Sequence, residues 1–88
     1  MSTRRVSFDE EFIRAFQKLP PSLQRRAEKV RLLFAENPFH PSLKLHKLSG
    51  KLEGYWSIWI NRQYRIILSM QGGGDAIFIS IGTHAVYN

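Results

Sequence analysis

Apolar side chains recur at helical spacing through the first 36 residues of the chain. The first run is Phe12, Ile13, Phe16 and Leu19, and the second is Leu23, Ala27, Val30, Leu33 and Phe34. Pro20 and Pro21 separate the runs, because a residue before proline avoids the α region and Pro21 suits the first turn of a helix. Asn37 and Pro38 end the second run. The pattern predicts an αα-hairpin over residues 8–36.

A short strand and a helix start are predicted just ahead of this hairpin. Residues 5–8 have the composition of a brief strand. Ser7 and Glu10 have the spacing of a capping box, and Asp9 and Glu11 add negative charge to the first turn. We therefore expect Ser7 to cap the first helix.

Three further strands are predicted at residues 54–61, 63–70 and 76–82, which are rich in β-branched and aromatic residues. The glycine cluster at residues 71–75 separates the last two strands. It precedes no helix, so a turn is favoured over a phosphate-binding loop. Residues 37–53 contain prolines and glycine and are predicted to be an irregular segment.

Alternation along these strands assigns one sheet face to the helices and leaves the other as a candidate functional surface. The face toward the helices is expected to hold Trp56, Ile58, Ile60, Ile66, Leu68, Ile77, Ile79 and Ile81. The opposite face is expected to hold Tyr55, Ser57, Trp59, Arg65, Ile67, Phe78, Ser80 and His84. Arginine, serine, tryptophan and histidine on one face are unlike a core.

Composition narrows the class of protein. Eighty-eight residues are expected to form one domain, 1–88, and without cysteine neither a disulfide nor a thiolate zinc site can stabilise it. Neither a signal peptide nor a membrane span is visible, so a soluble, cytoplasmic protein that does not interact with membranes is expected. The net charge is +6, and residues 37–70 carry five cations and a single acid, Glu53. Such a surface attracts polyanions, either nucleic acid or an acidic protein segment, although an ordinary basic bias explains the charge equally well.

The second half of the chain contains the side chains that metal-independent RNA cleavage requires. A base takes the proton of the ribose 2′-hydroxyl, that oxygen attacks phosphorus, an acid protonates the leaving oxygen, and cations stabilise the phosphoryl charge. His46 and His84 can transfer protons, Arg65 can hold a phosphate, and Tyr87 can stack or donate a proton. The three histidines lack metal-site spacing, so no metal and no cofactor are expected.

Each of these residues also has a plainer interpretation. His46 can be a solvated loop residue, Arg62 a turn residue, and Tyr87 a side chain that closes the edge of the core. Arg65 is more informative, because a charge inside an apolar strand must reach water or a partner.

The order of short motifs resembles the RelE/ParE superfamily of bacterial type II toxins, and most closely its RelE and YafQ-like branch. The motifs are Leu45-His46-Lys47-Leu48-Ser49-Gly50, Gly54-Tyr55-Trp56-Ser57, Tyr64-Arg65-Ile66-Ile67 and Ile81-Gly82-Thr83-His84, after the αα-hairpin. The resemblance implies an α+β fold in which two N-terminal helices pack on a small twisted antiparallel sheet. It also implies a ribosome-dependent endoribonuclease that cleaves mRNA.

The resemblance further implies roles for individual residues. His46 would transfer a proton, Arg65 would bind the scissile phosphate, His84 would be the general acid and Tyr87 would orient the substrate. Lys44, Lys47, Lys51 and Arg62 would contact phosphates. Some relatives place a carboxylate where this chain has Gln63 and a histidine where it has Trp59, so His46 is the expected base.

The implied partners are a cognate antitoxin that blocks the basic face, the ribosome with its mRNA, and operator DNA reached only through the antitoxin complex. Two other functions stay open on the same fold. One is a ParE-like inhibitor of DNA gyrase, which needs no proton-transfer residues. The other is a non-catalytic member that only binds an antitoxin.

Overall fold

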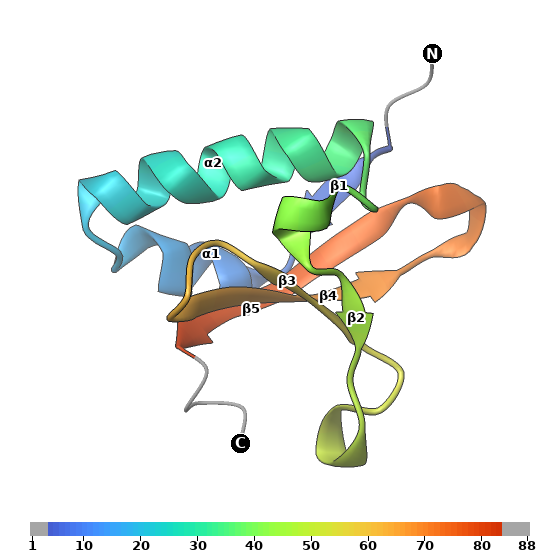
Figure 1. Ribbon diagram of the computed structural model, residues 1–88. Coiled ribbons are helices and arrows are strands. Elements are labelled where there is room, and N and C mark those ends of the chain that lie inside the picture. Colours follow the sequence, from blue (N-terminus) through green and yellow to red (C-terminus); the bar gives the residue numbers. More distant parts are fainter. Residues whose placement is uncertain (1–3, 84–88) are drawn as a thin grey trace.

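A computed structural model describes residues 4–83 (Figure 1). The helices are α1 (Glu10–Gln17) and α2 (Pro21–Glu36), and short 3-10 turns are η1 (Pro41–Leu43), η2 (Gly50–Leu52) and η3 (Gly72–Gly74). The strands are β1 (Val6–Phe8), β2 (His46–Lys47), β3 (Trp56–Trp59), β4 (Tyr64–Met70) and β5 (Ala76–Thr83). Both helices lie on one side of the sheet, as Figure 1 shows. The predicted two-layer α+β architecture is confirmed.

The sheet has five strands in the order β1-β5-β4-β3-β2. Strands β3 to β5 pair antiparallel, as predicted, and β2 adds a further antiparallel strand at the edge. Strand β1 instead runs parallel to β5, with Val6 opposite Ala76 and Phe8 opposite Phe78. The sheet is therefore mixed, because the αα-hairpin carries the chain back over the sheet before the antiparallel strands begin.

The start of α1 differs from the predicted capping box. Ser7 lies inside β1, opposite Ile77, so its backbone belongs to the sheet. Asp9 takes the N-cap position without a side-chain hydrogen bond, and its backbone N–H donates to the Phe78 carbonyl at 3.0 Å. Pairing with β5 thus fixes where the helix can begin. Pro21 opens α2 as predicted.

The core lies between the helices and the sheet, and Phe78 occupies its centre. This ring is fully buried and lies within 6 Å, centre to centre, of the rings of Phe8, Phe12 and Phe34. The prediction placed Phe78 on the opposite face, which is wrong. Ile77 and Ile79, which were predicted to face the helices, are not part of this core.

A β-bulge explains this exchange of faces. Ile67 pairs with Ser80 but Leu68 pairs with Phe78, so Ile79 has no residue opposite it. A bulge inserts one residue and reverses the alternation beyond it. Ile81 therefore faces the helices as predicted, whereas the residues before the bulge have the opposite parity.

The segment 37–53 is more regular than predicted. It contains η1, the two-residue strand β2 at the sheet edge, and η2. Lys44 links η1 to β2 in the left-handed conformation, with φ 49°. This turn sends the chain into β2, so His46 is held in the sheet instead of in a loop.

Candidate active site

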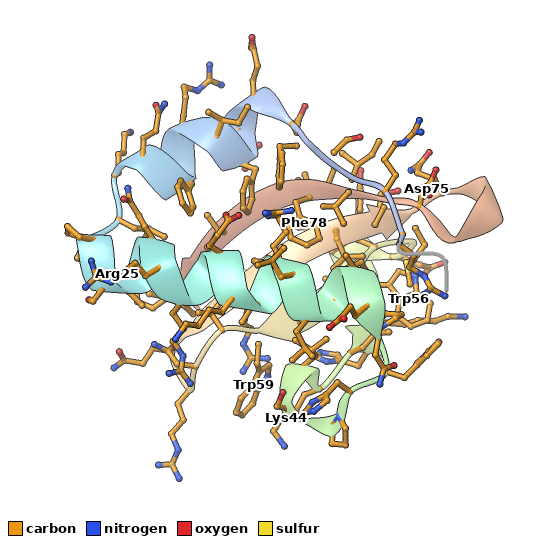
Figure 2. All side chains as sticks on the ribbon, turned by 90° about the horizontal axis from the view of Figure 1, so that it is seen from above. Arg25, Lys44, Trp56, Trp59, Asp75 and Phe78 are labelled. Carbon is orange, nitrogen blue, oxygen red and sulfur yellow. The ribbon has the colours of Figure 1, made fainter. Side chains whose placement is uncertain are left out.

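The clearest arrangement on the face away from the helices is the pair Arg65 and Trp59. They are cross-strand neighbours on β4 and β3, and the Arg65 Cζ atom lies 5.1 Å from the Trp59 ring centre. The Lys44 Nζ atom also lies 5.1 Å from this ring, and Figure 2 shows Lys44 beside Trp59. Each contact is within cation–π range. The Trp59 indole is thus in contact with two cations, Arg65 from β4 and Lys44 from the end of η1.

The Arg65 side chain retains unused hydrogen-bonding capacity. Its Nε atom is buried and has no hydrogen-bond partner among residues 4–83. A buried donor without a partner is costly and calls for an explanation. An anion bound at this guanidinium would satisfy the donor, as a phosphate oxygen does in a bidentate contact.

His46 lies at the sheet edge with its imidazole exposed, opposite Ser57 of β3. Its Nδ1 atom lies 2.9 Å from the Lys44 carbonyl oxygen. A carbonyl can only accept, so in this contact Nδ1 carries the hydrogen and, in the neutral ring, Nε2 keeps the free lone pair. The backbone of the turn at Lys44 therefore orients an imidazole that can accept a proton at Nε2.

Ser57 was predicted to lie on this face, but no individual role was predicted for it. It forms a row across the sheet with His46 on one side and Ile67, then Ser80, on the other. Its side chain is fully buried, and its Oγ atom has no hydrogen-bond partner in the described part of the chain. Arg65 is its diagonal neighbour on β4, because Ser57 pairs with Ile67. A polar residue inside an apolar strand was the signal available in the sequence.

The other predicted cations do not all lie on this face. Lys47 follows His46 on β2, pairs with Trp56, and its Nζ lies 5.4 Å from that ring centre, on the helix side of the sheet. Lys51 is exposed in η2, and Arg62 is exposed in the turn between β3 and β4. Of these cations only Lys44 is brought together with Arg65.

The turn that carries Arg62 is fixed by its neighbour Asn61. The Asn61 Oδ1 atom accepts hydrogen bonds from the backbone N–H groups of Gln63 and Tyr64, both at 2.8 Å. The position of β4, and hence of Arg65, is set by this turn. His84 and Tyr87, the predicted acid and orienting residues, lie outside the described residues.

Within residues 4–83 no group of three or more histidine and acidic side chains could hold a metal ion. The same part of the chain has no helix that is both long and apolar enough to span a membrane.

Comparison with known proteins identifies the protein family to which this chain belongs. Residues 21–88 match the ParE-like toxin domain. The chain belongs to this family, within the RelE/ParE superfamily of type II toxins, as the motifs predicted. The sequence matches no curated protein.

Solved structures extend the match to nearly the whole chain. YafQ from E. coli strain BL21(DE3) superposes with a TM-score of 0.79 at 17% identity, covering 96% of this chain and 97% of YafQ. A chain of the toxin-antitoxin complex RelBE2 from Mycobacterium tuberculosis gives 0.78 at 17% identity, covering 93% and 99%. A chain of the archaeal RelE-RelB complex from Pyrococcus horikoshii OT3 gives 0.75 at 22% identity, covering 92% and 94%. At these identities the likeness is one of fold.

Proposed function

We propose that this toxin is an endoribonuclease that cleaves mRNA on the ribosome without a metal ion, by attack of a ribose 2′-hydroxyl on the adjacent phosphorus. The observation that carries the proposal is the Arg65 guanidinium, held against Trp59 with a buried Nε–H that has no partner among residues 4–83. A phosphodiester would satisfy that donor and neutralise the charge. Cations placed where charge develops stabilise a phosphoryl-transfer transition state.

His46 supplies the general base in this mechanism. Its Nδ1–H is engaged by the Lys44 carbonyl, which leaves Nε2 to accept the 2′-hydroxyl proton. His84 returns a proton to the leaving 5′-oxygen, and Tyr87 orients the nucleotide. These last two roles rest on the resemblance to the superfamily.

The remaining cations bind the phosphates that flank the scissile bond. Lys44 is the best placed of them, because it shares the Trp59 ring with Arg65. Lys47, Lys51 and Arg62 are exposed farther from Arg65, Lys47 on the helix side of the sheet, and add attraction at longer range.

A cognate antitoxin is proposed as the second partner. Solved relatives with this fold come from toxin-antitoxin complexes such as RelBE2 and DinJ-YafQ. An antitoxin segment rich in acidic residues would neutralise the cations around Arg65 and exclude mRNA. Operator DNA would be reached only through that complex.

The proposal is tested by mapping mRNA 5′ ends after brief induction of the wild type, Arg65→Ala and His84→Ala. Cuts within translated codons are expected for the wild type and not for either variant. Arg14→Ala is the matched control for Arg65, because Arg14 is exposed on α1, remote from the sheet face, and should cut normally. Normal cleavage by both Arg65→Ala and His84→Ala would refute the mechanism.

Inhibition of DNA gyrase is the second candidate, favoured by the match to the ParE-like toxin domain. A supercoiling assay with purified gyrase separates the two functions. Inhibition of supercoiling without new mRNA ends would favour the gyrase poison over the ribonuclease.

A further inference from the structure

Among residues 4–83, three side-chain nitrogen or oxygen atoms are buried without a hydrogen-bond partner, and one of them lies outside the candidate active site. Two are Ser57 Oγ and Arg65 Nε of that site. The third is the Nε atom of Arg4, which precedes β1. A buried donor without a partner is costly. An acceptor for the Arg4 guanidinium is therefore to be sought outside this part of the chain.

Arg4 lies where three elements meet. Its backbone N–H donates to the Ala35 carbonyl in the last turn of α2 at 3.0 Å. The next residue, Arg5, accepts a hydrogen bond from the Ala76 N–H at the start of β5, also at 3.0 Å. Figure 1 shows the start of β1 beside the end of α2, on the side of the molecule where η3 joins β4 to β5. Arg4 and η3 (Gly72–Gly74) together are called the Arg4 corner.

The Arg4 corner is remote from the candidate active site. Asp75 follows η3, and Figure 2 shows Asp75 apart from Trp59 and Lys44. The last residue of β4, Met70, pairs with Ala76, whereas Arg65 lies near the other end of that strand. An anion at the Arg4 corner is therefore distinct from the phosphate proposed at Arg65.

The Arg4 guanidinium packs against the glycine turn. A Cβ atom at Gly74 would lie 3.3 Å from Arg4 Nε, 3.7 Å from Cζ and 3.8 Å from Nη2. The edge of the guanidinium that carries Nε and Nη2 therefore lies closest to the turn. Gly74 also has a positive φ of 88°, which other residues rarely adopt. Glycine at this position lets a guanidinium lie directly against the backbone of the turn.

The backbone of η3 has a conformation suited to anions. Gly72 has a negative φ, whereas Gly73 is left-handed with φ 78° and ψ 6°. Successive N–H groups in such a turn point into one concavity, called a nest, that binds anions. The first N–H group of a helical turn also has no partner within that turn. Gly72 and Gly73 are exposed, so a small ligand can reach their N–H groups.

The acids near the Arg4 corner leave the guanidinium unoccupied. The Asp75 Oδ1 atom accepts a hydrogen bond from the Arg5 backbone N–H at 3.1 Å, and within residues 4–83 no ion pair joins Arg4 to an acid. Glu36 is exposed at the end of α2. Two cations and two acids balance one another here, so a polyanion gains little from long-range attraction. The corner favours a single small anion that bonds to several donors.

We propose that Arg4 and the backbone of η3 bind one phosphate group, either inorganic phosphate or the phosphate of a small phosphomonoester. Its oxygens accept from the Nε–Nη2 edge of Arg4 and from the N–H groups of Gly72 and Gly73. Nε is covered in the unliganded protein, and a small outward movement of the glycine turn admits one phosphate oxygen. The bound phosphate joins the segment before β1 to the turn between β4 and β5.

The first test compares Arg4→Gln with Arg5→Gln. Sodium phosphate is titrated into isotope-labelled protein at constant ionic strength, and the backbone amide signals of Gly72–Gly74 are followed. They should shift and saturate in the wild type. Arg4→Gln should weaken binding by about 10-fold or more, the loss that corresponds to a charged hydrogen bond. Arg5→Gln is the matched control, because Arg5 is exposed and its bonds to Asp75 and Ala76 use its backbone.

The second test compares two substitutions at Gly72 and does not depend on how Arg4→Gln folds. Gly72 has a negative φ, follows Gln71 with an extended ψ of 167°, and a Cβ there would meet no atom within 4 Å. Proline and alanine both fit such a position. Gly72→Pro removes one N–H group of the nest and should weaken phosphate binding by about 2- to 10-fold. Gly72→Ala keeps that N–H group and should bind like the wild type.

Thermal unfolding gives an independent readout. A ligand that binds only the folded chain raises its unfolding temperature as the ligand concentration increases. The unfolding temperature of the wild type should rise with phosphate and not with chloride at equal ionic strength. Titration with adenosine monophosphate identifies the source of the phosphate. Tighter binding than inorganic phosphate assigns the site to a phosphomonoester, and weaker binding assigns it to the free ion.

Four results would overturn the proposal. Amide signals of Gly72–Gly74 that do not shift saturably in the wild type would remove the site. Equal affinities of Arg4→Gln and Arg5→Gln would show that net charge alone attracts phosphate. Equal affinities of Gly72→Pro and Gly72→Ala would remove the backbone from the site. Tighter binding of acetate than of phosphate would assign the corner to a carboxylate.

Failure of this proposal can be distinguished from failure of the proposed function. Arg65→Ala should lose mRNA cleavage but keep the phosphate-dependent shifts of Gly72–Gly74, because these signals report on the Arg4 corner. Arg4→Gln should lose the shifts and keep cleavage. If the wild type produces no mRNA cleavage, the amide titrations still decide whether the corner binds phosphate.

Discussion

Trp59 and Arg65 face each other across β3 and β4, with the Arg65 Cζ atom 5.1 Å from the centre of the Trp59 ring. The same ring is 5.1 Å from the Lys44 Nζ atom. Two cations held at one indole repel each other, and an anion between or beside them removes that repulsion. The indole therefore stabilises a concentration of positive charge at the place where we propose the phosphate binds.

Replacing the indole tests this role. Trp59→Leu should lower the rate of mRNA cleavage by about 2- to 30-fold, the range that corresponds to a cation–π contribution of about 0.5–2 kcal/mol. Trp59→Phe keeps an aromatic face and should lose less. Cleavage rates in a translation reaction, normalised to folded protein by circular dichroism, provide the measurement. A Trp59→Leu protein that cleaves as fast as the wild type would remove the indole from the mechanism.

The proposed base is tested at His46. His46→Gln keeps a polar side chain but cannot take up the proton, so cleavage should fall by about 10²- to 10⁴-fold. Thermal stability should barely change, because the side chain is exposed. The matched control is His40→Gln, since His40 lies before β2 and its ring bonds only to Ser42 among residues 4–83. If single-turnover cleavage by His46→Gln matches that of His40→Gln, another group is the base.

The substitution Ser57→Ala is expected to affect stability and cleavage activity in opposite directions. Its Oγ atom is buried without a partner in residues 4–83, so Ser57→Ala removes a desolvated polar group and should leave the free energy of unfolding unchanged or raise it by up to about 1 kcal/mol. Cleavage should nevertheless decrease if the hydroxyl contacts the phosphate held by Arg65. Urea unfolding and cleavage rates are measured on the same protein. Ser69→Ala is the comparison on β4, where the hydroxyl accepts a hydrogen bond from Gln71. A marked loss of stability in Ser57→Ala would show that its hydroxyl is paired in solution.

The aromatic centre of the core is tested at Phe78. Phe78→Ala deletes a fully buried ring and should lower the free energy of unfolding by about 3–5 kcal/mol, a large part of the stability of so small a domain. Phe39→Ala removes the same ring at a position that is 70% exposed and should change stability by less than about 0.5 kcal/mol. The urea concentrations at the midpoints of unfolding are compared for the two variants. Similar midpoints would contradict the placement of Phe78 on the helix side of the sheet.

Local signals in the sequence predicted the elements well. Pro20 and Pro21 divided the two helices, and alternation placed Ser57, Trp59 and Arg65 on the face away from them. Features set by distant pairing were missed. Ser7 has the local pattern of a cap but is held in β1 by a strand far along the chain, and the bulge at Ile79 reverses the parity of β5.

The candidate site was predicted in its residue types more than in its geometry. Arg65 was identified because a charge in an apolar strand is unusual. The bond from His46 to the Lys44 carbonyl depends on a left-handed turn at a lysine, which no short pattern indicates. Ser57 Oγ has no hydrogen-bond partner within the described residues because its surroundings are covered, which no local pattern indicates. The hydrogen bond from Arg26 to the Ile60 carbonyl depends on how α2 lies across the sheet.

The place of β5 in the sheet links the order of synthesis to the formation of the surface around Arg65. This strand is the last described element in the chain, yet it lies between β1 and β4 and supplies the ring at the centre of the core. While a ribosome is still making residues 76–83, β1 has no neighbour to pair with, and β4 lacks one of its two neighbours. The surface around Arg65 can therefore form only after β5 has been synthesised and has paired with both β1 and β4.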